Sequence, residues 1–190
     1  MEHETPHDLA GKLLIAMPGL GDDRFEGGVI YLCAHSDEGS MGLIINKVSA
    51  RISATDVFEQ LDIEADAAMP NLDVCYGGPV EMARGFVLHS ADYVDGDASL
   101  PVNEGFTMTA SKDILRDIAA GRGPSQRLLC LGYAGWSPGQ LDSEIAQNAW
   151  LTCDADQQIV FDLAGDQKWA AALETLGVSA ALLSATAGHA

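Results

Sequence analysis

One stretch of the sequence decides the expected fold: RLLCLGYAGWSPGQ, residues 127–140. Its first five residues, Arg127 to Leu131, have the apolar composition of a buried strand. A helix start follows from Ser137, because serine caps helices, proline is favoured at the first helical position, and a glutamine three residues on can bond back to the cap. The stretch therefore predicts a central strand joined to a helix that ends near Asn148.

Outward from this stretch, apolar runs separated by turn residues predict further short strands. Helices are expected after Ser53, after Ser111 and over residues 166–176. Because several strands follow one another without an intervening helix, the pattern favours an α+β fold with a mixed, largely antiparallel sheet and flanking helices. The strands are expected at residues 12–17, 28–34, 41–45, 73–76, 85–89, 106–109, 150–153 and 159–161, with the last two paired.

The composition limits the classes of function. Of 190 residues, 47% are apolar, which is enough for a packed core, and no apolar run approaches the length of a membrane span. The net charge of -18 repels phosphate backbones, and we find no local basic patch. These features predict a globular chain that neither enters membranes nor binds nucleic acid directly.

We expect one domain over residues 11–190, preceded by a flexible tail over residues 1–10. The tail contains acids but no lysine or arginine, unlike the start of a secretory signal, so a cytoplasmic protein is expected. The polar segment 91–103 is predicted to be a mobile surface loop. The four cysteines lie in apolar runs without a Cys-x-x-Cys pair, which indicates buried thiols rather than a zinc site.

Two glycine-containing segments are candidate binding sites. Residues 19–24 read Gly-x-Gly-x-x-Arg, half of a dinucleotide fingerprint, but the third glycine is missing and Asp22 would repel phosphate. A tight turn with an exposed ion pair is the simpler interpretation. Backbone amides at Gly77 and Gly78 could bind an anion, although a corner between two strands is favoured.

A second group of candidates lies around the decisive stretch. Tyr133 and Trp136 precede the predicted helix, and Gln140 and Glu144 form a polar line along it. A shallow polar site and a solvated surface are both compatible with this pattern. His89 ends a strand, where it could act as a general base or bond to the backbone as a structural residue.

Taken together, these segments resemble the YqgE/AlgH family of bacterial proteins, from about Gly11 to Asp162. Ala34 departs from the family pattern, in which an acid is expected beside His35. The resemblance implies a sheet curled into a partial barrel, and it implies no settled activity. Some members are named transcriptional regulators on genetic grounds. The residues that carry the resemblance are Met17-Pro18, Leu20, Asp22, Phe25, His35, Gly42, Ile45-Asn46-Lys47, Gly77-Gly78-Pro79-Val80, Leu88-His89, Gly132-Tyr133-Ala134-Gly135-Trp136, Gly139-Gln140-Leu141, Glu144 and Trp150.

The leading hypothesis is a binding module for a small molecule or a protein, with an indirect regulatory role and no cofactor or metal. An alternative is a metal-dependent hydrolase or nuclease-like enzyme in which Asp22, His89 and Glu144 hold a divalent ion. Direct regulation by DNA binding ranks last because of the charge, and self-association is left open. The candidate ligand-binding residues are Asp22, Asn46, Gly77, Gly78, His89, Tyr133, Trp136, Gln140 and Glu144.

Overall fold

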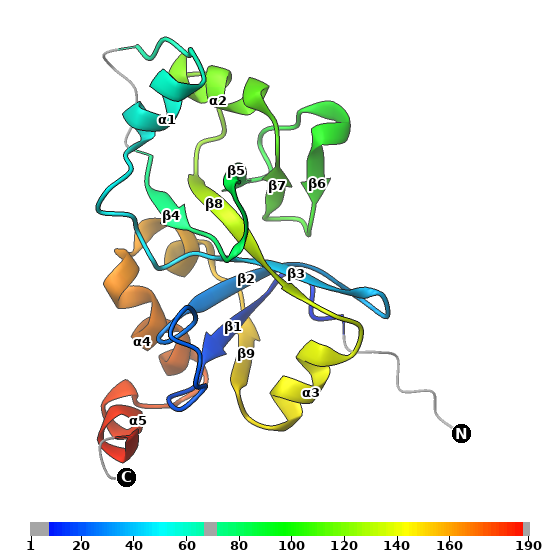
Figure 1. Cartoon of the computed structure of the whole chain (residues 1–190), viewed down its shortest axis with the longest axis vertical. Coiled ribbons are helices and arrows are strands. Elements are labelled where there is room, and N and C mark those ends of the chain that lie inside the picture. Colours follow the sequence, from blue (N-terminus) through cyan, green and yellow to red (C-terminus); the bar gives the residue numbers. More distant parts are fainter. Residues whose placement is uncertain (1–7, 67–71, 188–190) are drawn as a thin grey trace.

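The structure, a computed structural model, describes residues 8–66 and 72–187, so most of the expected N-terminal tail lies outside it. Within these ranges, nine strands form one sheet and helices surround it (Figure 1). The strands are β1 (Lys12–Ala16), β2 (Val29–Ser36), β3 (Gly39–Ile44), β4 (Val74–Tyr76), β5 (Val80–His89), β6 (Ser99–Pro101), β7 (Thr107–Thr109), β8 (Arg127–Trp136) and β9 (Trp150–Asp154). The helices are α1 (Ala54–Gln60), α2 (Lys112–Ala119), α3 (Gln140–Ala146), α4 (Gly165–Thr175) and α5 (Ala180–Ala187), with short turns η1 (Gly96–Ala98) and η2 (Gln158–Asp162).

Strand β8 organises the sheet. The strand order is β6-β7-β5-β8-β3-β2-β1-β9, and β4 also pairs with β8. The β4–β8 pair is parallel and all other pairs are antiparallel. The long strand β8 pairs with β5 in one half of the curved sheet and with β3 in the other, and so connects the two halves (Figure 1). The expected α+β fold, with a largely antiparallel sheet curled into a partial barrel, is confirmed.

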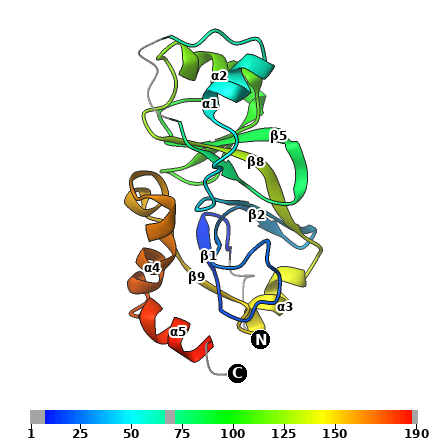
Figure 2. The same ribbon diagram turned by 60° about the vertical axis from the view of Figure 1, so that its left-hand side comes forward.

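Both faces of the sheet are covered. Along β1, Leu13 and Ile15 join one apolar cluster, whereas Leu14 and Ala16 join another, because successive side chains of a strand point to opposite faces. Helix α4 packs against β1 and β2 on the first side, and α3 contacts β3 and β9 on the second. Figure 2 shows α1 and α2 together over the far end of β5 and β8, where they form a third cluster.

Two predicted helix caps are confirmed. At α1, the Ser53 hydroxyl accepts a hydrogen bond from the Asp56 amide (3.2 Å), and the Asp56 carboxylate accepts one from the Ser53 amide (2.8 Å). At α2, the Ser111 hydroxyl accepts a hydrogen bond from the Ile114 amide (3.3 Å). These bonds begin both helices at the residues that the sequence indicated.

The junction after Leu131 differs from the prediction. Strand β8 continues for five residues beyond Leu131, because Ala134 to Trp136 pair with β3. Helix α3 consequently begins at Gln140 with Gly139 as its N-cap, instead of Ser137, and it ends at Ala146. The Gln140 side chain still accepts a hydrogen bond from the Ser137 amide (3.0 Å). The predicted bond between Gln140 and Ser137 thus forms, but pairing with β3 extends the strand to Trp136 and delays the start of the helix.

The predicted strand at residues 159–161 is wrong. These residues belong to the π-helical turn η2, and β9 pairs with β1 instead. The Asp156 side chain accepts a hydrogen bond from the Gln158 amide (2.7 Å), and Ile159 and Val160 are buried within this helical geometry. The segment 91–103, predicted as a loop, also contains η1 and the edge strand β6.

Candidate functional site

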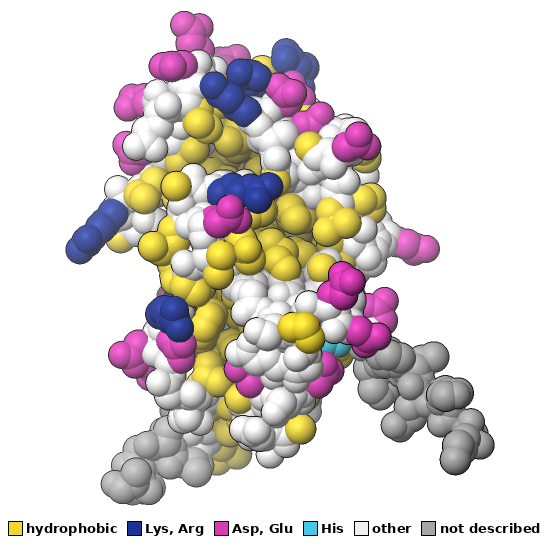
Figure 3. All heavy atoms as spheres, turned by 45° about the vertical axis from the view of Figure 1, so that its right-hand side comes forward, with side chains coloured by type: hydrophobic (Ala, Val, Ile, Leu, Met, Phe, Trp, Pro, Cys, Tyr) yellow, Lys and Arg dark blue, Asp and Glu magenta, His cyan; other side chains and the backbone are white. Residues whose placement is uncertain are grey.

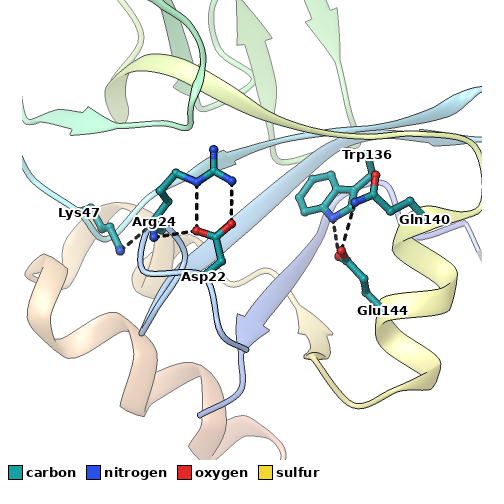
Figure 4. Close-up of polar contacts among 6 residues, drawn as sticks. All are labelled: Asp22, Arg24, Lys47, Trp136, Gln140 and Glu144. Carbon is teal, nitrogen blue, oxygen red and sulfur yellow. Dashed lines mark hydrogen bonds and ion pairs between the residues drawn. The ribbon is translucent and has the colours of Figure 1, made fainter. Parts of the chain in front are cut away.

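Glu144 is the centre of a cluster that attaches α3 to the sheet. Its carboxylate accepts hydrogen bonds from the indole N–H groups of Trp136 (2.8 Å) and Trp150 (3.0 Å), and from the Gln140 side chain (3.2 Å). Figure 4 shows Trp136 and Gln140 both pointing at this carboxylate. The two indole rings meet edge to face with centroids 6.0 Å apart. Through Glu144, the predicted polar line along α3 therefore links the helix to β8 and β9. Both oxygens of the Glu144 carboxylate accept hydrogen bonds within the fold.

Asp22 forms an ion pair with Arg24 inside its own loop. The guanidinium donates to both carboxylate oxygens, at 3.0 and 2.7 Å, and the Arg24 amide adds a third hydrogen bond. These bonds from Arg24 lower the pKa of Asp22. The Lys47 ammonium donates to the carbonyl oxygen of Arg24 (2.9 Å), which attaches the loop to the segment after β3 (Figure 4). The geometry is that of a turn closed by an ion pair.

Asn46 connects the end of β3 to the start of β2. Its side-chain oxygen accepts a hydrogen bond from the Val29 amide (2.8 Å), and its side-chain nitrogen donates to the Gly27 carbonyl (2.8 Å). Both ends of the amide are thus used within the fold. The asparagine aligns two strands.

Gly77 and Gly78 lie where the β4–β5 connection passes against β8. A Cβ atom at Gly77 would lie 2.3 Å from the Gly132 carbonyl oxygen, and one at Gly78 would lie 2.1 Å from the carbonyl carbon of Tyr133. The Gly77 amide donates to the Leu131 carbonyl, so it is not open to an anion. The glycines allow two backbones to touch, as in the strand-corner interpretation.

His89 is fully buried and belongs to a hydrogen-bonded chain. One ring nitrogen, Nδ1, must donate to the Ser90 carbonyl (2.7 Å), since a carbonyl only accepts. Nε2 then accepts from the Thr109 hydroxyl (2.7 Å), whose oxygen in turn accepts from Ser99 (2.7 Å). Burial lowers the pKa of His89 and favours this neutral form. No substrate proton can reach a ring enclosed in this way.

The metal-site alternative fails on geometry. Asp22, His89 and Glu144 each have different partners, in separate parts of the fold. Across residues 8–66 and 72–187, no three His, Cys, Asp or Glu side chains gather closely enough to hold a metal ion. The predicted three-residue metal site is therefore not assembled, because Asp22 in the loop after β1, His89 at the end of β5 and Glu144 on α3 do not meet.

A groove of about 740 Å³ lies where β8 leaves β5 and joins β3. Tyr133 and Trp136, two of the predicted residues, line it, and the Tyr133 ring packs edge-on against Phe86 with centroids 5.7 Å apart. Other apolar walls come from Val80 on β5, Leu100 on β6 and Met108 on β7. Figure 3 shows apolar side chains gathered in a band along this side of the molecule.

Sequence reasoning missed the walls that β5, β6 and β7 supply. Val80 and Leu100 are 37% and 42% exposed. They are also far apart along the chain. They reach Tyr133 only because β6 pairs with β7, β7 with β5, and β5 with β8. The available signal was an apolar pair, Val80 and Met82, directly after the Gly77–Gly78 corner.

The groove also contains a stretch of strand that is paired on one side. Beyond Tyr133, which pairs with Val80, residues Ala134 to Trp136 pair with β3. On the opposite side of these residues, toward β5, no strand partner occurs in the described part of the chain. Gly135 and Trp136 thus give the groove a backbone edge as well as an apolar wall.

Comparison with known proteins gives a consistent result. The AlgH-like family (DUF179) matches residues 13–181. A UPF0301 protein of Jannaschia sp. is 56% identical over 98% of both chains, and one of Ruegeria pomeroyi is 58% identical over 96% of this chain and 100% of its own. The solution structure of AlgH from Pseudomonas aeruginosa superposes with a TM-score of 0.79 and 44% identity over 100% of both chains.

None of the described helices combines the length and apolar character needed to span a membrane.

A crystal structure from Corynebacterium diphtheriae, 21% identical with a TM-score of 0.67, shares the fold. The family residues quoted from the sequence lie in the loop after β1, in and just after the β2–β3 hairpin, at the β4–β5 corner, in β5 and β8, and around α3. By its sequence and its fold, the chain belongs to the AlgH-like family.

Proposed function

We propose that this protein is a protein-binding module that takes an extended apolar segment of a partner into the groove beside β8. The observation that carries the proposal is the combination of apolar walls with a one-sided strand in one groove. An added strand can pair with such an edge through backbone hydrogen bonds, while alternate side chains enter the pockets beside it. The aromatic ring of Tyr133 would supply contact area at low entropic cost.

A binding role is favoured over catalysis by the state of the polar candidates. The carboxylates of Asp22 and Glu144 and the ring of His89 are bonded within the fold. The groove itself is walled mainly by apolar side chains and strand backbone. An open groove of this kind fits an extended polypeptide better than a small ligand, whose site buries most of its surface.

We further propose that any effect on gene expression passes through this partner. The net charge of -18 opposes direct contact with DNA. The protein is also proposed to be cytoplasmic, because Cys33, Cys75, Cys130 and Cys153 are buried free thiols, which are typical of a reducing compartment.

Photo-cross-linking tests the groove. A benzophenone amino acid at Leu100, in the groove, is compared with one at Leu176, at the end of α4; both positions are 42% exposed. A cross-link from position 100 that is absent at 176 identifies the partner segment, which is then synthesised. In NMR titration that peptide should shift the amides of Ala134 to Trp136 and slow their hydrogen exchange, and Leu100→Glu should abolish binding while Leu176→Glu does not.

Either of two results would contradict the proposal. One is equal cross-linking at positions 100 and 176. The other is a cross-linked peptide that binds without protecting the amides at 134–136. In that case, native mass spectrometry of the purified protein would show whether a small molecule occupies the groove instead.

A further inference from the structure

A second cavity, of about 460 Å³, lies between the α1–α2 layer and the first half of β5, at residues 82–85. Val57 and Leu61 from α1, Leu115 from α2 and Leu131 from β8 form its apolar floor. Met82 on β5, which is 59% exposed, borders the opening. The volume falls in the range of small-molecule sites, roughly 300–1,000 Å³. The cavity is separate from the groove, and Arg84 borders both.

A bulge in β5 shapes this cavity. The β5–β8 register jumps from Val80–Tyr133 to Gly85–Leu131, so residues 81–84 lie opposite Gly132 alone. Glu81 adopts a positive φ of 48°, and a Cβ at Gly132 would lie 2.4 Å from the Gly78 carbonyl oxygen and 2.9 Å from that of Val80. The bulge therefore requires a glycine on β8, and it moves residues 82–84 outward toward α2.

The charge at this cavity is opposite to that of the whole molecule. Two of the ten basic residues, Arg84 and Lys112, line it, and no carboxylate does. By contrast, Glu38 and Glu81 line the groove, and Asp22, Asp23 and Glu26 line a hollow in the loop after β1. A cationic rim above an apolar floor is therefore a local property of this cavity, in a chain with net charge -18.

Both cations are free enough to bind a ligand. Lys112 takes part in none of the ion pairs formed by the described residues. Arg84 lies over the Phe86 ring, 5.0 Å from its centroid, and its pair with Glu81 is exposed and 3.5 Å long. Such exposed ion pairs contribute little to stability, so a ligand anion can replace Glu81 at Arg84. Beside Lys112, the Ser111 hydroxyl donates a hydrogen bond to the Asp95 carboxylate, which is thereby engaged within the fold.

We propose that this cavity binds a small organic anion with an apolar body. The body would lie on the floor formed by Val57, Leu61, Leu115 and Leu131, and a carboxylate or phosphate head would lie between Arg84 and Lys112. The first turn of α2, which begins at Lys112, adds the positive end of a helix. The bound state needs no change of fold, since the cavity is already formed.

The test uses dodecanoate and dodecyl phosphate as probes, with dodecanol as the neutral control, in calorimetry and NMR titrations at about 0.15 M salt to limit general repulsion by the acidic protein. We expect at least one anionic probe to bind with a submillimolar dissociation constant and dodecanol to bind more weakly. Amide shifts should map to residues 82–85, 110–115 and 57–61. Comparing the two anions identifies the preferred head group.

Variants separate this cavity from the groove. Lys112→Gln, which changes the cavity alone, should weaken binding of the anion about fivefold, and the double variant with Arg84→Gln at least about tenfold, as expected for charge-assisted contacts at a partly exposed site. Arg116→Gln on α2, whose side chain pairs with Asp113 (2.7 Å) and does not line the cavity, removes the same charge and should leave binding unchanged. Ala83→Trp, which fills the opening, should abolish it.

The proposal is overturned if neither anion binds, if dodecanol binds as tightly as the anions, or if Lys112→Gln and Arg116→Gln behave alike. Shifts confined to Tyr133, Gly135 and Leu100 would also overturn it, since they would place the probe in the groove. Failure of the peptide experiment at the groove leaves the prediction for Lys112 unchanged.

Discussion

Trp136 and Glu144 are joined by a 2.8 Å hydrogen bond that connects the end of β8 to α3. The indole is 8% exposed, and the same carboxylate oxygen also accepts from Trp150 at 3.0 Å. One side chain on a seven-residue helix thus satisfies two buried donors on two different strands. Since a helix this short is marginal by itself, these bonds account for its position on the sheet.

Replacing Glu144 should destabilise the protein. Glu144→Ala leaves two largely buried indole N–H groups without an acceptor, and we expect a loss of about 2–4 kcal/mol in the free energy of unfolding. Urea denaturation followed by tryptophan fluorescence measures it. Ser143→Ala, an exposed change on the same helix, is the control and should have little effect. Equal stability of both variants would show that these hydrogen bonds make no net contribution to the free energy of unfolding.

The glycine at the β4–β5 corner should be required by space rather than by backbone conformation. Gly77→Ala places a methyl group 2.3 Å from the Gly132 carbonyl oxygen, so we expect a loss above about 3 kcal/mol or failure to fold. Gly121→Ala is the matched comparison: its φ is 77° but its Cβ would meet open space, so a loss of about 1–2 kcal/mol is expected. Thermal and urea unfolding rank the two, and the reverse order would refute the close-contact explanation.

His89 should make stability depend on pH. Because burial lowers its folded pKa, the unfolded state binds more protons as pH falls below about 6.5, and stability is lost toward acid by at most about 1.4 kcal/mol per pH unit. Above that pH the neutral ring contributes fully. Unfolding measured from about pH 7.5 to about pH 5.5 should give a sloping profile for the native chain and a flatter one for His89→Gln. Parallel profiles would exclude His89 as the source.

Lys168 should be essential for the turn η2. Its buried ammonium donates to the carbonyls of Ile45 (3.0 Å) and Val160 (2.7 Å), which joins η2 to the end of β3. Lys168→Ala removes the bonds and leaves a void, so we expect a loss of about 3–5 kcal/mol. Lys168→Met, which keeps the volume, should lose less.

Lys12→Ala is the control for this pair of variants. Lys12 bonds Asp154 at the surface, where the two side chains are 41% and 88% exposed, so removing it should cost below about 1 kcal/mol. It changes the net charge by the same amount as Lys168→Ala. Urea unfolding monitored by circular dichroism compares all three, and equal losses for Lys12→Ala and Lys168→Ala would mean that the buried bonds are not specific.

Local signals in the sequence were accurate where the interaction is local. The caps at Ser53 and Ser111 need only residues three apart, so the starts of α1 and α2 were predictable. The hairpin of β2 and β3 also follows from two neighbouring strands and a short turn. The site residues near α3 were found together because Trp136, Gln140 and Glu144 lie within nine consecutive residues.

Errors occurred where a distant segment decided the outcome. The pairing of residues 134–136 with β3 turned a predicted loop into a strand, and the buried Lys168 bonds one carbonyl of a turn that had been predicted as a strand. His89 could be a base or a structural residue by sequence, and Thr109, twenty positions away, made it structural. A local sequence pattern cannot indicate such partners, because distant residues become neighbours only when the chain folds.

By itself, the sequence determined the acidic charge, the α+β class, the helix starts and the family resemblance, since each rests on composition or on residues close together in the chain. The tertiary structure decided which candidates are fully engaged within the fold and where open surfaces remain. Val80, Leu100 and Tyr133 form one groove, and Arg84 and Lys112 border one cavity, only because strand pairing and helix packing bring distant residues together. Long-range contacts create these surfaces, and their formation depends on the free energy of the whole fold.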